Sequence, residues 1–274
     1  MADTSGTLLS VGLRFAEAFL LDSSGNPVCT GAITSGSVAA TPGYPFDGAK
    51  AFELTIPEPR KITHTGNDRV LAVDFLPATD GVNGTLNVAE NDYALNAMLQ
   101  GVAVAVVGEA KGVAYNTDQQ GSEPDVSLLL YQQSQDSATG LRRWRTGLVA
   151  RARAIPMPPG MNDTPAEVKY ALTANPSTKS IWGETLTSGS YGCTQASYME
   201  FMCEGLPALE AFQGSAANPT HLVLSTAPKT AAKVAVYKNG VKLATPGGYS
   251  LATKTITLVA AITAADYVWV WYEK

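Results

Sequence analysis

Residues 69–101 read RVLAVDFLPATDGVNGTLNVAENDYALNAMLQG, and the periodicity of this stretch decides the fold class. From Arg69 to Leu76, apolar residues alternate with smaller or polar ones, which is the period-two pattern of a β-strand with one face in a core. After a turn that contains two Asx-Gly pairs, residues 85–88 alternate again as a second, shorter strand. Alternating strands of this kind predict a mainly β protein.

The period changes from about Asn91, where apolar residues begin to recur at three- and four-residue spacing. Leu95 and Leu99 then fall on one side of a short helix, with an Asn or Asp available as the N-cap and Gly101 as the terminating residue. It is the one helix that we predict. A short amphipathic helix among strands indicates an antiparallel β-sandwich or barrel whose open side the helix covers.

The composition is that of a globular, turn-rich chain, because 45% of the 274 residues are hydrophobic, 16% are charged and 25 are glycines. A formal net charge of −5 argues against a protein whose main task is to grip nucleic acid, but it is compatible with transient passage of DNA. The first residues, MADTSGTLL, lack the cationic start and apolar run of a secretory signal. No apolar run approaches the roughly 20 residues of a membrane-spanning helix, so we expect synthesis in a cytoplasm and no membrane insertion.

No sequence motif predicts catalysis or a bound metal. Nucleophile elbows, phosphate-cradling glycine loops and metal-ligand spacings are missing in the required context. The only histidines, His64 and His221, fall in different predicted domains. Three cysteines cannot all pair within the chain, so we expect Cys29, Cys193 and Cys203 to be reduced core thiols. The prediction is a protein that is not an enzyme and has no cofactor.

Early in the chain, residues 11–21 predict a strand, and residues 28–38 predict its partner after a tight turn. Residues 39–51, ATPGYPFDGAKA with its neighbouring alanine, then combine two prolines, two glycines and the aromatic residues Tyr44 and Phe46. This pattern predicts a long loop, and loops of this length are usually functional or become ordered on contact with another molecule.

Later in the chain, a long hairpin is predicted, and its second arm, residues 141–155, is rich in arginine. If that strand is regular, one face carries arginines and the other carries Trp and Ala, whereas a bulge at Gly147 would reverse the parity. The arginine face has three interpretations, which are a contact with a neighbouring subunit, a solvated face with nearby carboxylates, and direct contact with nucleic acid. The residues of this face are Arg143, Arg145, Arg151 and Arg153.

The last part of the chain predicts a second domain. Small and polar residues at 213–220 indicate a linker, so we predict domains at 1–215 and 216–274, the second being a small all-β, Ig-like module. Asn239-Gly240 is a strong signal for a type I′ hairpin. In the final strand, Trp269 and Trp271 share one face and could stack on a sugar, fill the small core, or dock the module on its neighbour.

The C-terminal pattern resembles a module common in the virion proteins of tailed bacteriophages. Its features are a strand, an Asn-Gly-Val turn, a Tyr-centred turn, a Thr-Ile-Thr strand, an Asp and a final alternating aromatic strand. The matching residues are Val234 to Tyr237, Asn239-Gly240-Val241, Tyr249, Thr255-Ile256-Thr257, Asp266 and Val268 to Tyr272.

In layout, the first 215 residues resemble the major tail tube protein of phages with long, non-contractile tails. The shared layout is an N-terminal strand pair, a long loop, a central strand and hairpin, one short helix ending in Leu-Gln-Gly, a late hairpin, and a Trp-Gly loop before the last strand. Long strands whose edges are not all blunted by Lys or Pro suit a protein that completes its sheets with its own copies.

The resemblance implies a virion tail protein that forms stacked hexameric rings, with the C-terminal module displayed outside and DNA only transiently in the lumen. Its partners would be copies of itself and the tape-measure and tail-terminator proteins. The loop with Tyr44, Phe46 and Asp47 would lock ring to ring, Asp and Glu would line the lumen, and the arginine face would point away from it. The alternatives are a capsid decoration or baseplate protein, and a carbohydrate-binding module that uses Trp269 and Trp271.

Overall fold

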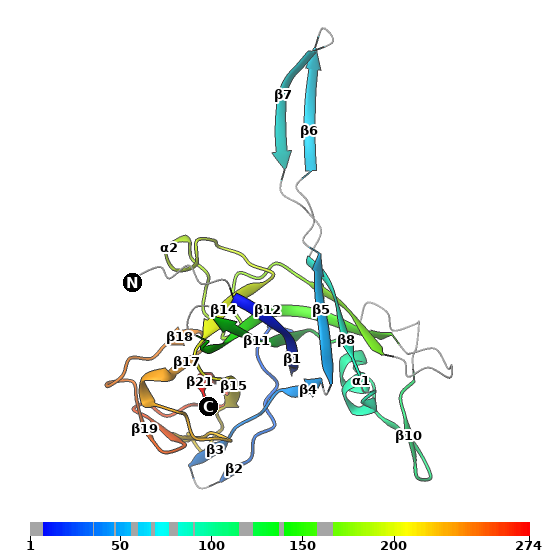
Figure 1. Cartoon of the computed structure of the whole chain (residues 1–274). Coiled ribbons are helices and arrows are strands. Elements are labelled where there is room, and N and C mark those ends of the chain that lie inside the picture. The colour runs from blue at the N-terminus through cyan, green and yellow to red at the C-terminus, as the bar shows by residue number, and fades with distance from the viewer. Residues whose placement is uncertain are drawn as a thin grey trace.

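The chain is mainly β with two short helices, as its alternating pattern predicts (Figure 1). The structure is a computed structural model, and it describes residues 8–34, 36–46, 48–55, 60–66, 69–76, 82–89, 91–114, 123–136, 140–157 and 167–274.

An eight-stranded antiparallel sheet forms the body, in the order β4-β1-β11-β12-β13-β8-β5, with β14 added beside β12. The sheet curls around its core, because β5 at one end of this order lies close to β1 near the other end. The strands are β1 (Leu8–Leu20), β4 (Tyr44–Phe46), β5 (Ala49–Thr55), β8 (Val82–Val88), β11 (Val126–Asp136), β12 (Arg142–Met157), β13 (Val168–Ala174) and β14 (Met199–Cys203).

Helix α1 (Tyr93–Gln100) covers the inner side of this sheet, where it packs on β12 and β4. The side chain of Asp92 caps its first turn by accepting hydrogen bonds from the backbone N–H groups of Ala94 and Leu95, at 2.8 and 3.3 Å. Gly101 ends the helix with a φ of 67°, in the left-handed region. The predicted helix and both of its ends are therefore confirmed. A second, four-residue helix is α2 (Ser188–Tyr191), and a 3-10 turn follows at Ala231–Lys233.

Two hairpins stand apart from the sheets, each as an independent two-stranded ribbon. Figure 1 shows the first at the top of the molecule, beyond β5 and β8, and the second at the bottom, below α1. They are β6 (Arg60–Gly66) with β7 (Arg69–Leu76), and β9 (Ala105–Val107) with β10 (Ala110–Gly112). The predicted strand at Arg69–Leu76 is thus confirmed, although it pairs with β6 and not in the main sheet. Its predicted core face lies outside the described side chains.

The C-terminal part forms a sandwich of two further sheets, ordered β15-β21-β17-β18 and β19-β20-β16-β3-β2. The first sheet contains β15 (Pro207–Gln213), β21 (Tyr267–Glu273), β17 (Val234–Lys238) and β18 (Val241–Lys242). The second sheet contains β19 (Tyr249–Ala252), β20 (Thr255–Leu258), β16 (His221–Val223), β3 (Ser37–Ala39) and β2 (Ile33–Thr34). Asn239 and Gly240, both at positive φ, turn the β17–β18 hairpin as expected.

The sandwich recruits strands from outside residues 216–274. β3 pairs in parallel with β16, with Val38 opposite Leu222, and β15 pairs with β21. The predicted partnership of residues 28–38 with the first strand is therefore wrong, because β1 is flanked by β11 and β4. Val38 is only 1% exposed, and its burial in the core of the sandwich explains why this segment leaves the main sheet. The boundary between residues 215 and 216 stays a prediction.

Strand β21 is buried on both faces, because it lies between two hydrophobic cores. Val268, Val270 and Tyr272 face the core of the sandwich. Trp269 and Trp271 face the opposite way, toward a cluster that includes Phe19 of β1. The sheet that contains β21 is thus the middle layer between the main sheet and the outer sheet of the sandwich.

Candidate functional site

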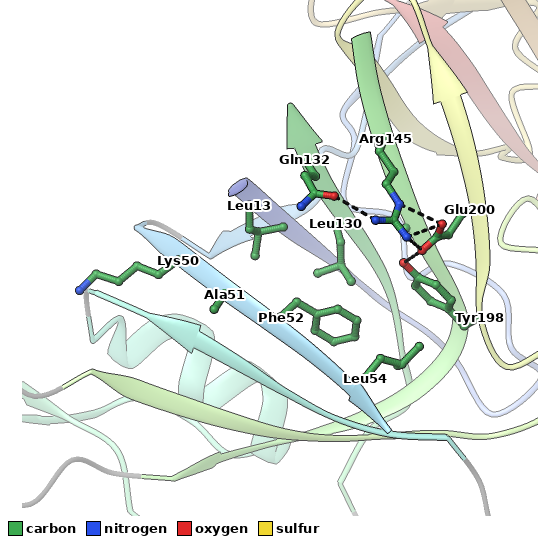
Figure 2. A pocket seen from close by; sticks show the side chains of 11 residues that line it. Leu13, Lys50, Ala51, Phe52, Leu54, Leu130, Gln132, Arg145, Tyr198 and Glu200 are labelled. Carbon is green, nitrogen blue, oxygen red and sulfur yellow. Dashed lines mark hydrogen bonds and ion pairs between the residues drawn. The ribbon is translucent and has the colours of Figure 1, made fainter. Parts of the chain in front are cut away.

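A cleft of about 430 Å³ opens between β5 on one side and β12 with β14 on the other (Figure 2). Apolar side chains form part of its lining, and polar and charged side chains form the rest. The apolar residues are Leu13, Ala51, Phe52, Leu54 and Leu130, and the polar ones are Lys50, Gln132, Arg145, Tyr198 and Glu200.

Arg145 and Glu200 form a bidentate ion pair across β12 and β14 at the rim of the cleft. The guanidinium donates from Nε and Nη2 to Oε2 of Glu200 at 2.9 and 2.7 Å, and from Nη1 to Oε1 of Gln132 at 3.3 Å. Tyr198 donates its hydroxyl to Glu200 at 2.8 Å. Hydrogen bonding to Glu200 raises the pKa of Arg145, and burial together with Glu200 raises the pKa of Tyr198. Arg145 therefore stays charged at neutral pH, and Tyr198 stays in its hydroxyl form.

Gly147 makes room for Tyr198 in the middle of β12. A Cβ at Gly147 would lie 2.5 Å from the hydroxyl oxygen of Tyr198, so the phenol sits directly against the strand backbone. On its other side, the ring of Tyr198 lies 6.3 Å from that of Phe52, between ring centroids. Gly147 is thus a site of close approach, and the bulge suspected there lies further along the strand.

The four arginines do not share one face, because β12 is not regular and carries a bulge, which was the alternative that the sequence left open. Leu128 pairs with Val149 but Val126 pairs with Ala152, so the side-chain parity changes between these two pairs. Before the bulge, Arg145 and, by alternation, Arg143 lie on the inner face with the cleft. After it, Arg151 and Arg153 lie on the outer face.

The two outer arginines share one carboxylate. Arg151 donates from Nε to Oδ2 of Asp125 at 2.7 Å, and Arg153 donates from Nε to Oδ1 at 3.4 Å. The side chain of Asp125 is 10% exposed, whereas those of the arginines are 43% and 41% exposed. This part of the face matches the interpretation of arginines solvated beside a carboxylate, and a contact with a neighbouring subunit stays a prediction.

The predicted loop at residues 39–51 is wrong, because β4 and the start of β5 occupy it. Phe46 is fully buried in the core, edge-on to Tyr170 at 5.0 Å between ring centroids, so it is not available to a neighbouring ring. Tyr44 is 42% exposed beside Ala18, and Asp47 lies outside the described residues. Phe46 is buried because β4 pairs with β1 and places this side chain in the hydrophobic core of the main sheet.

Trp269 and Trp271 do not form an exposed aromatic face. Trp269 is 3% exposed and meets Phe19 of β1 edge-on at 5.1 Å, while Trp271 lies 6.0 Å from Trp182, both between ring centroids. Trp182 also stacks on Tyr237 at 5.4 Å between ring centroids. The indoles dock the sandwich on the main sheet, which was one of the interpretations left open by the sequence.

Sequence reasoning missed most of the cleft. Lys50 donates to Oε1 of Glu167 at 2.9 Å, and Glu200 meets Arg145, yet neither pair is close in sequence. The one local signal was Gly147 within an otherwise regular strand, since glycine there indicates a bulge or a close approach.

The chemistry of the described residues is otherwise plain. The three cysteines are free, as predicted, but only half-buried, and burial raises the pKa of Cys29 and of Cys203 to about 11. Within the described ranges, no group of three or more His, Cys, Asp or Glu could hold a metal ion. Over the same part of the chain, no helix has the length and apolar character needed to cross a membrane.

In comparisons with known proteins, no family model and no curated protein matches the sequence.

Proposed function

We propose that this chain is a structural protein of a phage virion that self-assembles into stacked hexameric rings, which form the tail tube for DNA delivery. In this proposal the protein is made in the host cytoplasm, becomes part of the virion tail and has no catalytic role. Its partners are copies of itself and the tape-measure and tail-terminator proteins, and DNA passes only transiently.

The observation that carries the proposal is the β6–β7 ribbon. Within the described residues, β6 and β7 form ladders only with each other, and Figure 1 shows them extending far beyond the body. A two-stranded ribbon is marginally stable at best in water, and its outer edges present unpaired backbone groups. Contact with a second copy would supply hydrogen-bond partners for the edges of the ribbon and a surface for it to pack on. We therefore assign the ring-to-ring contact to this ribbon in place of residues 39–51.

The distribution of covered and uncovered surface on the main sheet also supports a subunit that forms part of a tube wall, with one side outward and the other inward. The sandwich covers the outer face of β1, β11 and the first half of β12. On the outer face of β13, β8 and β5, by contrast, Lys169, Thr173, Asn83 and Glu53 are exposed. In a tube, we expect the sandwich on the outside and these uncovered strands toward the inside.

If this uncovered surface lines the tube, it differs from the acidic lumen that we expected, and it carries two of the arginines that we expected to point away from the lumen. Arg151 and Arg153 pair there with Asp125, and Lys169 and Glu53 are exposed on the same face, so these three cations are nearly balanced by two carboxylates. Pairing with Asp125 reduces the attraction of the two arginines for phosphate. A near-neutral surface with Thr and Asn side chains would still let DNA slide without strong adsorption.

Negative-stain electron microscopy of the purified chain over a range of concentrations tests the proposal. We expect six-fold rings or hollow tubes as the concentration rises. A discrete trimer would favour a capsid decoration or baseplate protein, and a monomer at every concentration would contradict self-assembly. As a matched variant, replacing residues 57–80 by a short Gly-Ser linker should leave the circular dichroism and thermal unfolding of the body unchanged while preventing tubes.

A further inference from the structure

The β9–β10 hairpin presents apolar side chains to solvent. Val106 is 62% exposed and Val107 is 79% exposed, the latter being the most exposed large hydrophobic residue in the described part of the chain. In the part of the chain that the structure describes, the two strands pair only with each other, over three residues, and Gly108 turns between them at a φ of 63°. So short a hairpin gains little from its own ladder, and its valines gain free energy only if another surface covers them.

The cleft beside β5 has the complementary character. Leu13, Phe52 and Leu54 offer apolar surface inside it, and the charged groups stand around its opening (Figure 2). The side chain of Lys50 is 52% exposed, and that of Glu200 is 37% exposed. An apolar knob flanked by charges would therefore meet apolar surface in the middle and charges at the rim, which is the usual anatomy of an interface.

The charges of the two surfaces also match in sign. Just after the valines, the hairpin carries Glu109 and then Lys111, both in exposed positions. At the rim of the cleft, Lys50 on β5 pairs with Glu167, and Glu200 on β14 pairs with Arg145. Each of these two pairs is partly exposed, so the acid of the hairpin can approach Lys50 and its base can approach Glu200, each as an additional partner of opposite charge.

We propose that the β9–β10 hairpin of one copy of this chain docks in the β5–β12–β14 cleft of a second copy, with Val107 as its apolar anchor and Glu109 facing Lys50. Hairpin and cleft share no residue, so the contact can run head to tail from copy to copy, and its repetition then builds a ring or an open filament, whereas a reciprocal exchange of hairpins would close as a dimer. The inference rests on the self-assembly proposed above and names the surfaces that make it.

Sedimentation velocity of Val107→Asp tests the apolar anchor. We expect the apparent association constant to fall by about tenfold or more, because a buried carboxylate replaces an apolar contact. Val259→Asp is the matched control, since Val259 is 73% exposed but lies in the sandwich, and it should associate like the unchanged chain. Both variants should keep the thermal midpoint of the monomer, because neither valine is buried.

Charge reversal tests the orientation of the hairpin. Glu109→Lys should weaken association, and the double variant Glu109→Lys with Lys50→Glu should regain part of the loss. If the unchanged chain stays monomeric at every concentration, the proposed function fails together with this inference. If it assembles and Val107→Asp assembles equally well, the proposed function survives and this docking mode is overturned. Absence of any rescue in the double variant would also overturn the Glu109–Lys50 contact.

Discussion

Strand β21 and the two projecting hairpins lie at opposite extremes of the same molecule. β21 is covered on one face by the core of the sandwich and on the other by the main sheet, with Trp269 only 3% exposed. Among the described residues, the β6–β7 and β9–β10 ribbons form ladders only within themselves, and Val107 of the second is 79% exposed. The chain thus covers the apolar surface of the sandwich with its own residues, whereas the edges and exposed valines of the hairpins are left for a second copy to cover. The predictions below test both halves of this contrast.

The largest effect on stability is expected at the junction between β21 and the main sheet. Trp269→Ala should lower the free energy of unfolding by about 3–5 kcal/mol, because the buried indole leaves a cavity against Phe19. Urea unfolding followed by circular dichroism measures this loss. Trp271, which is only half-buried, is the matched control and should lose less on the same substitution. Equal losses of stability in the two variants would show that burial of Trp269 against Phe19 contributes nothing special to the junction.

A smaller effect is expected where the sandwich touches the loop at Gly183. A Cβ at Gly240 would lie 2.0 Å from the carbonyl oxygen of Gly183, so Gly240→Ala adds a clash to the strain of a positive φ. Gly25→Ala isolates the strain, because Gly25 has the same φ of 78° and no atom within 4 Å of its Cβ position. We expect Gly240→Ala to lower the free energy of unfolding, measured by thermal denaturation, by about 1–3 kcal/mol more than Gly25→Ala does. Similar losses of stability in the two variants would show that the loop at Gly183 moves away from the new methyl group at no cost.

The smallest effect is a pH dependence at the β17–β18 hairpin. Burial would raise the pKa of Asp266, but hydrogen bonds from Thr263, Asn239 and Lys238 outweigh it and lower the pKa from 3.8 to about 2. A lowered pKa stabilises the fold above pH 3.8, and this contribution is lost as the pH falls toward 2. Asp266→Asn should therefore be less stable than the unchanged chain at pH 5, and the difference should shrink at pH 2. A stability difference between the two proteins that is the same at pH 5 and pH 2 would contradict a lowered pKa at Asp266.

Local periodicity predicted much of the fold. The alternation of residues 85–88 correctly predicted a strand, which is part of β8, and the signals at Asp92 and Gly101 correctly bounded α1. These features depend on neighbours within one element, which a single sequence carries.

Pairing between distant segments was beyond the sequence. The parallel pairing of β3 with β16 depends on an apolar Val38 that could serve any sheet, and nothing near residue 38 specifies Leu222 as its neighbour. The bulge in β12 lies in a run of small and apolar residues that tolerates either parity, so two arginines were placed on the wrong face. The cleft combines both difficulties, because it joins β1, β5, β12 and β14.

Hydrogen–deuterium exchange of the purified chain, measured below and above the concentration at which it assembles, tests the central contrast most directly. We predict that the amides of β21 are protected in both samples, whereas those of β6, β7, β9 and β10 exchange rapidly in the dilute sample and become protected in the assembled one. Ribbon amides that exchange equally fast in both samples, while β21 stays protected, would contradict the account.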